Sequence, residues 1–113
     1  MKIEKLIERV KAGDADALRT VYETYSQRMR NVCIRITQED EDTVSDLVQE
    51  AFIRAYYLSG KLKDSSKFGE WIVAITKNVS LRYCQHLRYV WIFIASLLLQ
   101  ACAAILGHKS YGV

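Results

Sequence analysis

The sequence predicts an all-α protein, and three observations support this class. Apolar residues recur at spacings of three and four along most of the chain, which is the periodicity of amphipathic helices. The 113 residues include no proline and only five glycines, so long helices meet few breakers. Half of the residues are hydrophobic, enough for the core of one small domain. We expect a compact bundle of about four helices over residues 1–88, followed by a hydrophobic C-terminal helix within 89–113.

The first two predicted helices lie on either side of Gly13. Apolar residues at 3, 6, 7 and 10 predict a short amphipathic helix, and Gly13 suits the position just after its end. Asp14 is the expected N-cap of the second helix. The apolar stripe of that helix consists of Leu18, Val21, Tyr22, Tyr25, Met29, Val32, Cys33 and Ile36. These side chains are most simply core residues.

The third predicted helix follows a polar loop at residues 38–42. Thr43 and Asp46 have the spacing of a capping box, which predicts that this helix starts at Thr43 and runs to about Leu58. Its expected buried stripe is Leu47, Val48, Ala51, Phe52, Ala55 and Tyr56. The other face carries Asp46, Gln49, Glu50 and Ile53. From spacing alone, that face is either simply solvated or a docking surface for basic side chains.

The fourth predicted helix follows a short basic loop. Ser59 and Gly60 end the third helix, and residues 61–66 are basic and rich in serine, with Ser66 as the expected cap of the next helix. The buried stripe of this fourth helix is Phe68, Trp71, Ile72, Ile75 and Val79.

The charges are unevenly distributed. Residues 39–53 hold six acidic and no basic side chains, whereas residues 54–88 hold seven basic and two acidic ones. This pattern indicates two surfaces with different partners, or else ordinary solubilising charges. Cations interleaved with Phe68, Trp71 and Tyr83 favour nucleic-acid binding for the basic segment.

Signatures of catalysis and of metal binding are missing from the sequence. It contains no glycine-rich phosphate loop, no HExxH and no GxSxG. The three cysteines are widely spaced without a CxxC pair, which argues against a disulfide framework or a zinc site and fits a reducing cytoplasm. We therefore expect a protein that is not an enzyme and needs no cofactor.

Two ordered motifs resemble region 2 of sigma-70 family RNA polymerase sigma factors, of the extracytoplasmic-function (ECF) type. The first is Asp46-Leu47-x-Gln49-Glu50-x-Phe52, and the second is Phe68-x-x-Trp71-Ile72-x-x-Ile75-x-x-Asn78. The resemblance covers roughly residues 3–88. It implies a specificity factor for transcription initiation, which binds core RNA polymerase and recognises and melts the promoter −10 element.

The resemblance also assigns the two sets of site residues. The implied polymerase-binding residues, which would meet the clamp helices of the largest subunit, are Asp46, Leu47, Gln49 and Glu50. The implied DNA-binding residues are Lys61, Lys63, Ser65, Lys67, Trp71, Lys77, Asn78 and Arg82. Val73 and Ala74 depart from the aromatic and basic residues that the family often carries there, so one phosphate contact is expected to be missing. An anti-sigma factor is a further partner that the resemblance implies.

The segment from residue 89 to residue 107 has a different character. Its nineteen residues carry no charge, and as a helix they would span roughly 29 Å, close to the hydrocarbon thickness of a bilayer. Basic residues precede it, which would place the bundle in the cytoplasm. No segment matches the domain that reads the −35 element, so the sigma region is expected to be truncated. The alternatives are a membrane-tethered interaction protein and a non-functional fragment whose tail comes from a shifted reading frame.

Overall fold

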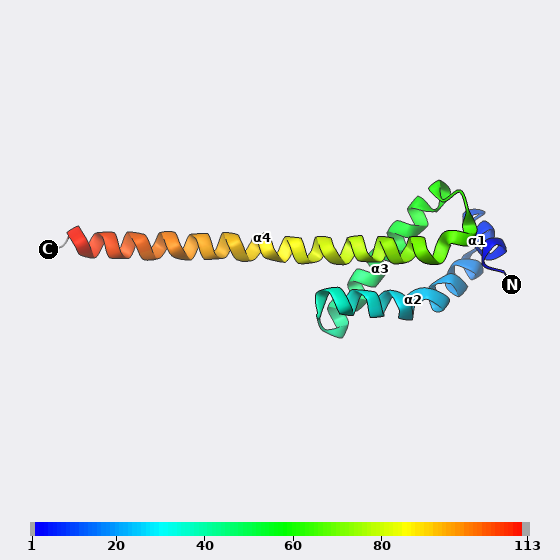
Figure 1. The fold of residues 1–113 in the computed structure, drawn as a ribbon, viewed down its shortest axis with the longest axis horizontal. Coiled ribbons are helices and arrows are strands. Elements are labelled where there is room, and N and C mark those ends of the chain that lie inside the picture. The colour runs from blue at the N-terminus through cyan, green and yellow to red at the C-terminus, as the bar shows by residue number, and fades with distance from the viewer. Residues whose placement is uncertain (1, 112–113) are drawn as a thin grey trace. The chain divides into compact units, whose positions relative to one another are not determined.

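The computed structural model describes residues 2–111, with side chains described through Gly107, and it confirms the all-α class. The α-helices are α1 (Ile3–Lys11), α2 (Ala15–Thr37), α3 (Glu41–Leu58) and α4 (Phe68–Tyr111) (Figure 1). Two single-turn 3-10 helices, η1 (Ser59–Lys61) and η2 (Ser65–Lys67), connect α3 to α4. The chain divides into two compact units, residues 1–82 and residues 83–113.

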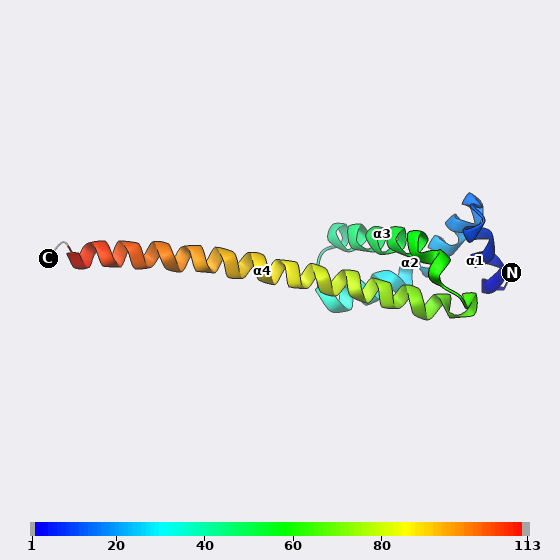
Figure 2. The same ribbon diagram turned by 90° about the horizontal axis from the view of Figure 1, so that it is seen from above.

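In the first unit, α2 is the central element. It packs against both α1 and α3 (Figure 2), and the short turn at residues 38–40 reverses the chain between α2 and α3. Gln38 ends α2 in the left-handed conformation, with a φ of 55°, and its backbone N–H donates to the Ile34 carbonyl. This arrangement closes the last turn of α2 without a glycine.

The core of this unit draws apolar side chains from all four helices. Fully buried members include Ile7, Val21, Met29, Val44, Val48 and Ile72. Two edge-to-face aromatic pairs flank them, with ring centroids 4.9 Å apart for Tyr22 and Phe52 and 5.2 Å apart for Tyr25 and Phe68. Burial of this apolar surface is the main term that holds the bundle together.

The predicted stripes are largely confirmed, with exceptions at their edges. Tyr56, which the spacing places in the core, is exposed. Several other stripe residues are half-buried: Ile3, Leu18, Tyr22, Tyr25, Ile36, Phe52, Trp71 and Ile75. In α4 the structure adds two buried polar residues that the apolar pattern passes over, Thr76 and Ser80. A hydroxyl at a buried position has no apolar signature, so hydrophobic periodicity cannot find it.

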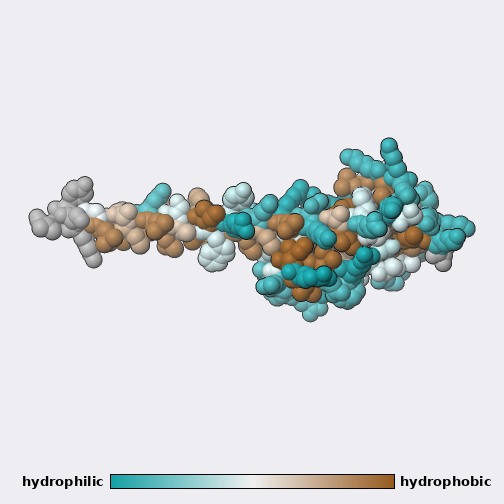
Figure 3. Space-filling view, in the orientation of Figure 1, coloured by the Kyte–Doolittle hydropathy of each residue, from teal (hydrophilic) through white to brown (hydrophobic). Residues whose placement is uncertain are grey.

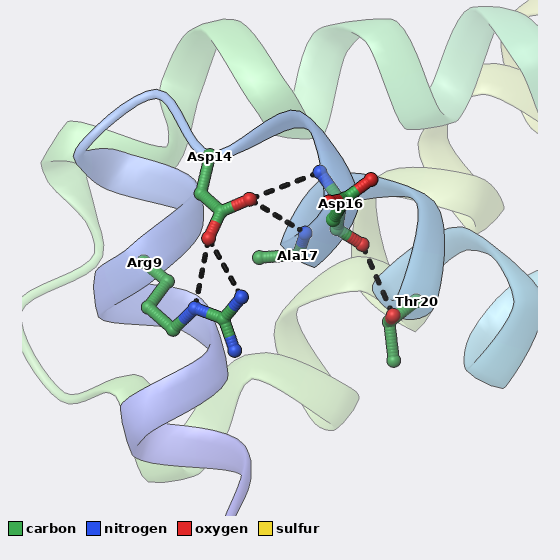
Figure 4. A network of polar contacts seen from close by, with 5 residues as sticks. All are labelled: Arg9, Asp14, Asp16, Ala17 and Thr20. Carbon is green, nitrogen blue, oxygen red and sulfur yellow. Dashed lines mark hydrogen bonds and ion pairs between the residues drawn. The ribbon is translucent and has the colours of Figure 1, made fainter.

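Gly13 and Asp14 join α1 to α2 as predicted, and Figure 4 shows Asp14 between the two helices. Gly13 has a φ of +92°, its N–H donates to the Val10 carbonyl, and the N–H of Asp14 donates to the Arg9 carbonyl, which together make a Schellman motif. The Asp14 side chain then accepts from the backbone N–H groups of residues 16 and 17. Arg9 also donates to the Asp14 carboxylate at 2.7 Å and, with the N–H of Ala17, holds the pKa of that carboxyl below its ordinary value.

The predicted start of α3 is wrong. Asp40, and not Thr43, is the N-cap: the Asp40 carboxylate accepts from the Thr43 N–H at 2.9 Å, and α3 begins at Glu41. This hydrogen bond also lowers the pKa of Asp40. Asp40 is the better N-cap because a helix that starts after it has Glu41 and Asp42 in its first turn, where the helix dipole favours anions.

The predicted cap of the fourth helix is also corrected. Ser66 lies inside η2, and Asp64 is the N-cap of that 3-10 helix: its carboxylate accepts from both the N–H and the hydroxyl of Ser66, at 3.1 and 2.6 Å. These two hydrogen bonds lower the pKa of Asp64, the hydroxyl contributing most. The turn η2 forms on this cap and leads directly into α4 at Phe68.

The second unit consists of the remainder of α4. Its large apolar side chains are exposed, among them Tyr89, Trp91, Phe93 and Leu99, and the space-filling view shows a largely apolar surface (Figure 3). Within the described residues, α4 is the one helix long and apolar enough to cross a membrane, by length and composition only, with a mean hydropathy of 2.2 over its most apolar window.

Candidate functional site

One candidate surface is the outer face of α3, which carries a row of exposed side chains. Asp46, Gln49 and Glu50 are exposed, whereas Leu47 is buried and holds the helix to the core. Glu50 lies 3.5 Å from Arg54, one turn further along the same helix. This ion pair is at the surface and leaves Glu50 half-exposed, so the carboxylate stays accessible to a partner.

Two exposed apolar residues extend this row: Ile53, which the helical spacing already places on this face, and Tyr57, which the sequence analysis did not include. Ile53 is 55% exposed and Tyr57 is 80% exposed, and both continue the spacing of three and four from Asp46 and Glu50. We call the set Asp46, Gln49, Glu50, Ile53 and Tyr57 the α3 face. Its first half is acidic and its second half is apolar. The signal that could have indicated Tyr57 is its spacing, because it follows Ile53 by four positions and Glu50 by seven.

The start of α3 is fixed against α2 by a single arginine. Arg30 donates to the Ser45 hydroxyl at 2.9 Å and to the Glu41 carboxylate at 3.1 Å. Glu41 is therefore paired within the bundle, whereas Asp46 has no ion pair among the residues that the structure describes. The Glu41 side chain is 83% exposed, so this ion pair lies at the surface and both carboxylates remain accessible.

The second candidate surface begins in the connection between α3 and α4. Lys61, Lys63 and Lys67 are exposed and project their charges into solvent. Ser65 is buried, and its hydroxyl donates to the Glu8 carboxylate of α1 at 2.8 Å. That hydrogen bond, together with the nearby Lys11, lowers the pKa of Glu8. Ser65 is therefore placed to support the loop from beneath rather than to present its hydroxyl outward.

The first turns of α4 continue the basic surface. Trp71, Asn78 and Arg82 follow one another at intervals of seven and four residues, which puts them on one side of α4, and Lys67 is the last residue of η2 just before this helix. Lys67, Asn78 and Arg82 are exposed, and Trp71 is half-buried with its ring centroid 5.8 Å from that of Phe68. Lys77 is exposed on an adjacent strip. We call this set, with Lys61 and Lys63, the basic face.

Arg28 of α2 also reaches the start of α4, and sequence reasoning left it out. A Cβ atom added to Gly69 would lie 3.4 Å from Arg28 Nη1 and 3.4 Å from the Tyr25 ring. Gly69 therefore lets α2 and α4 approach closely, and brings the exposed Arg28 next to the helix that carries the basic face. Only the folded structure reveals this proximity, because 41 positions separate the two residues.

The two faces differ in chemistry. Exposed ammonium and guanidinium groups beside a partly accessible indole suit phosphates and bases, whereas carboxylates followed by apolar side chains suit a basic protein surface. Within residues 2–107, no three His, Cys, Asp or Glu side chains gather as metal ligands would. The fold and the two faces define a helical interaction domain.

Comparison with protein families identifies this domain. The sequence profile of sigma-70 region 2 matches residues 21–89, which is more than half of the chain. The chain therefore belongs to the sigma-70 region 2 family.

Curated relatives agree with the predicted ECF type. The chain is 33% identical over 81 residues to the ECF RNA polymerase sigma factor SigW of Bacillus subtilis, covering 72% of this chain and 43% of the relative. It is 32% identical over 78 residues to the ECF RNA polymerase sigma-E factor of Escherichia coli, covering 69% and 40%. The RNA polymerase sigma-H factor of Pseudomonas aeruginosa is 30% identical over 77 residues, covering 68% and 39%. The chain spans less than half the length of these relatives.

Proposed function

We propose that this chain acts in the cytoplasm as the region 2 module of a sigma factor, a specificity factor in transcription initiation and not an enzyme. The observation that carries the proposal is the separation of charge in a bundle of this family: an accessible acidic and apolar set on α3, and an accessible basic set on the loop and α4. One face would bind core RNA polymerase, and the other would hold the promoter −10 element.

The α3 face is proposed to dock on the clamp helices of the largest polymerase subunit. Asp46, Gln49 and Glu50 would supply charged and polar contacts to a basic partner, and Leu47 would act from the core by fixing the helix. Ile53 and Tyr57 would add apolar contact area at one end. An anti-sigma factor that covers this face would compete with polymerase.

The basic face is proposed to hold the melted strand. Lys61, Lys63, Lys67, Lys77 and Arg82 would contact phosphates, which supplies affinity independent of sequence. Asn78 carries an amide that can read a base edge, and Trp71 offers part of its ring for stacking. Extracting a base from the stack costs a few kcal/mol, and these contacts would have to offset that cost.

Single substitutions on the basic face test this division of roles. We expect Asn78→Ala to reduce the preference for the −10 strand over a random strand, because phosphate contacts remain, and Lys67→Ala to weaken binding to both strands about equally. The measurement is fluorescence anisotropy with labelled single strands, core polymerase and the full-length chain, at several salt concentrations. Lys67→Ala should also make the salt dependence shallower.

Lys5→Ala is the matched control, because Lys5 is an exposed lysine on α1 with no hydrogen bond or ion pair to the described residues of the basic face. It should leave affinity and preference unchanged. If Asn78→Ala and Lys67→Ala have the same effect on specific and random strands, the proposed division is wrong.

The second half of α4 supports one additional proposal, that the chain is tethered to a membrane. The specific observation is an uncharged helical stretch of sufficient length whose side chains are exposed. Exposed apolar surface of this extent is an aggregation liability in water, whereas lipid would cover it. We expect the full-length chain to partition into membranes or detergent, and a chain ending at Arg88 to be soluble, monomeric and equally helical per residue.

Fractionation of cells expressing each chain, followed by circular dichroism, measures both expectations. Recovery of the full-length chain as a monomer in detergent-free buffer would refute the tether. In that case the chain would act as a freely diffusing factor, and the proposed polymerase and DNA contacts would stand unchanged.

A further inference from the structure

Helix α1 contacts the loop that leads into α4 at two points far apart in sequence. The Lys11 ammonium group donates to the Leu62 carbonyl oxygen at 2.7 Å. The Ser65 hydroxyl donates to the Glu8 carboxylate at 2.8 Å. Spans of 51 and 57 residues separate the partners, so these are tertiary contacts and not features of a local turn.

The two contacts form one connected unit. Lys11 Nζ lies 3.5 Å from the same Glu8 oxygen that accepts from Ser65. The Lys11 side chain is 22% exposed and Ser65 is 6% exposed, so these two members are largely screened from water, whereas the Glu8 side chain that links them is 64% exposed. Hydrogen bonds in which one partner is charged are the stronger kind, and partial burial limits competition from water.

The contacted residues lie next to the exposed lysines of the basic face. Leu62 is between Lys61 and Lys63, and Ser65 precedes Lys67 by two positions. Ser65 also starts η2, so a shift of Ser65 would move the turn that leads into α4. Holding Leu62 and Ser65 therefore fixes the backbone from which these lysines project.

We propose that Glu8 and Lys11 of α1 are positioning residues for the loop at 61–67, and that they hold it in the conformation that recognises an unpaired nucleotide. This inference rests on the proposed function of the basic face. A loop fixed before binding loses less conformational entropy when a strand binds, and it admits fewer strand geometries. The contacts should therefore contribute to sequence preference, whereas the lysine charges contribute to overall affinity.

The position of α1 gives this proposal a specific consequence. The family profile begins at residue 21, whereas α1 spans Ile3–Lys11. Recognition of the nucleotide by residues 61–67, which lie within the matched segment, would thus depend on α1, which lies outside that segment.

Two substitutions remove the contacts with little other change. Lys11→Met keeps most of the aliphatic stem and removes the donor to Leu62, and Ser65→Ala removes the hydroxyl and leaves Glu8 intact. Lys5→Met is the matched control, since it removes one exposed charge from α1, and no hydrogen bond or ion pair joins Lys5 to the described residues of the loop. All variants are made in the full-length chain and measured in mild detergent with core polymerase.

The first measurement is hydrogen exchange without DNA. Amides of residues 62–67 should exchange faster in Lys11→Met and Ser65→Ala, while the amides of α2 and α3 keep their wild-type protection. The second measurement compares binding to the −10 strand and to a random strand. Preference should fall about three- to tenfold in both variants, with the slope of affinity against salt unchanged.

Each result has one meaning. Unchanged loop exchange, or unchanged preference in a variant whose loop exchanges faster, overturns the positioning role. A wild-type chain that prefers neither strand refutes the proposed function itself, and this outcome is distinguishable because loop exchange is measured without DNA. Lys5→Met should match the wild type in both measurements, and equal losses in Lys5→Met and Lys11→Met would assign the effect to charge alone and overturn the proposal.

Discussion

Replacing Ile72 with alanine is expected to cost about 2–5 kcal/mol of unfolding free energy in a chain ending at Arg88, because the substitution leaves a cavity in the core. Ile72 has no exposed surface and comes from the part of α4 that packs within the first unit. A domain of this size has roughly 5–15 kcal/mol in total, so the loss is a large fraction. Urea unfolding followed by circular dichroism measures it.

Leu81→Ala is the matched control for this prediction. Leu81 lies on the same helix and in the same unit, but it is 50% exposed. Its replacement should change the unfolding free energy by less than about 0.5 kcal/mol. Comparable losses at both positions would mean that α4 does not pack on the bundle through the Ile72 face.

Glu50→Lys is expected to weaken binding to core RNA polymerase at least about tenfold, since a reversed charge within an interface replaces attraction with repulsion. In the wild type the Glu50 carboxylate lies 3.5 Å from the Arg54 guanidinium group. The substitution replaces this carboxylate with an ammonium group of the same sign as Arg54. That change is at the surface of α3, so helicity should be unchanged. A pull-down of core polymerase with the tagged chain, with circular dichroism of each variant, gives both quantities.

Glu23→Lys is the control for charge. Glu23 is exposed on α2, and reversing it changes net charge by the same amount without altering the α3 face. It should bind polymerase as the wild type does. Undiminished binding by a folded Glu50→Lys variant would remove Glu50 from the proposed interface.

The helices could be predicted from the sequence because their signals are local. Apolar spacing predicts the helices of the bundle, and Gly13 with Asp14 predicts the α1–α2 joint. The fourth helix and the expected hydrophobic C-terminal helix are one continuous helix, α4, because no proline or glycine interrupts residues 70–106. The error at the start of α3 has the same origin. Asp40 and Thr43 are both acceptable caps, and the choice depends on which start satisfies more backbone groups, which a single spacing does not reveal.

The candidate site was only partly predictable. Exposure of Asp46, Glu50 and the loop lysines follows from polarity and helical phase. The burial of Ser65 and its hydrogen bond to Glu8 could not be predicted in this way, because a serine side chain occurs both on surfaces and in buried positions. Contacts between residues more than fifty positions apart carry no local signal, so the contribution of α1 emerged only from the structure.

The buried face of α4 is apolar at Phe68 and Ile72 and then mixes Val79 with two hydroxyl-bearing residues, Thr76 and Ser80, and this change bears on how the helix opens. Phe68 and Ile72 anchor the first turns, whereas the buried Thr76 hydroxyl donates to the Ile72 carbonyl of its own helix, at 2.8 Å. The Ser80 hydroxyl is buried and finds no hydrogen-bond partner in the described part of the chain, a situation that costs about 1–3 kcal/mol. Local unfolding of this region should therefore begin around Ser80, and the turn at Phe68 should be the last part of α4 to detach.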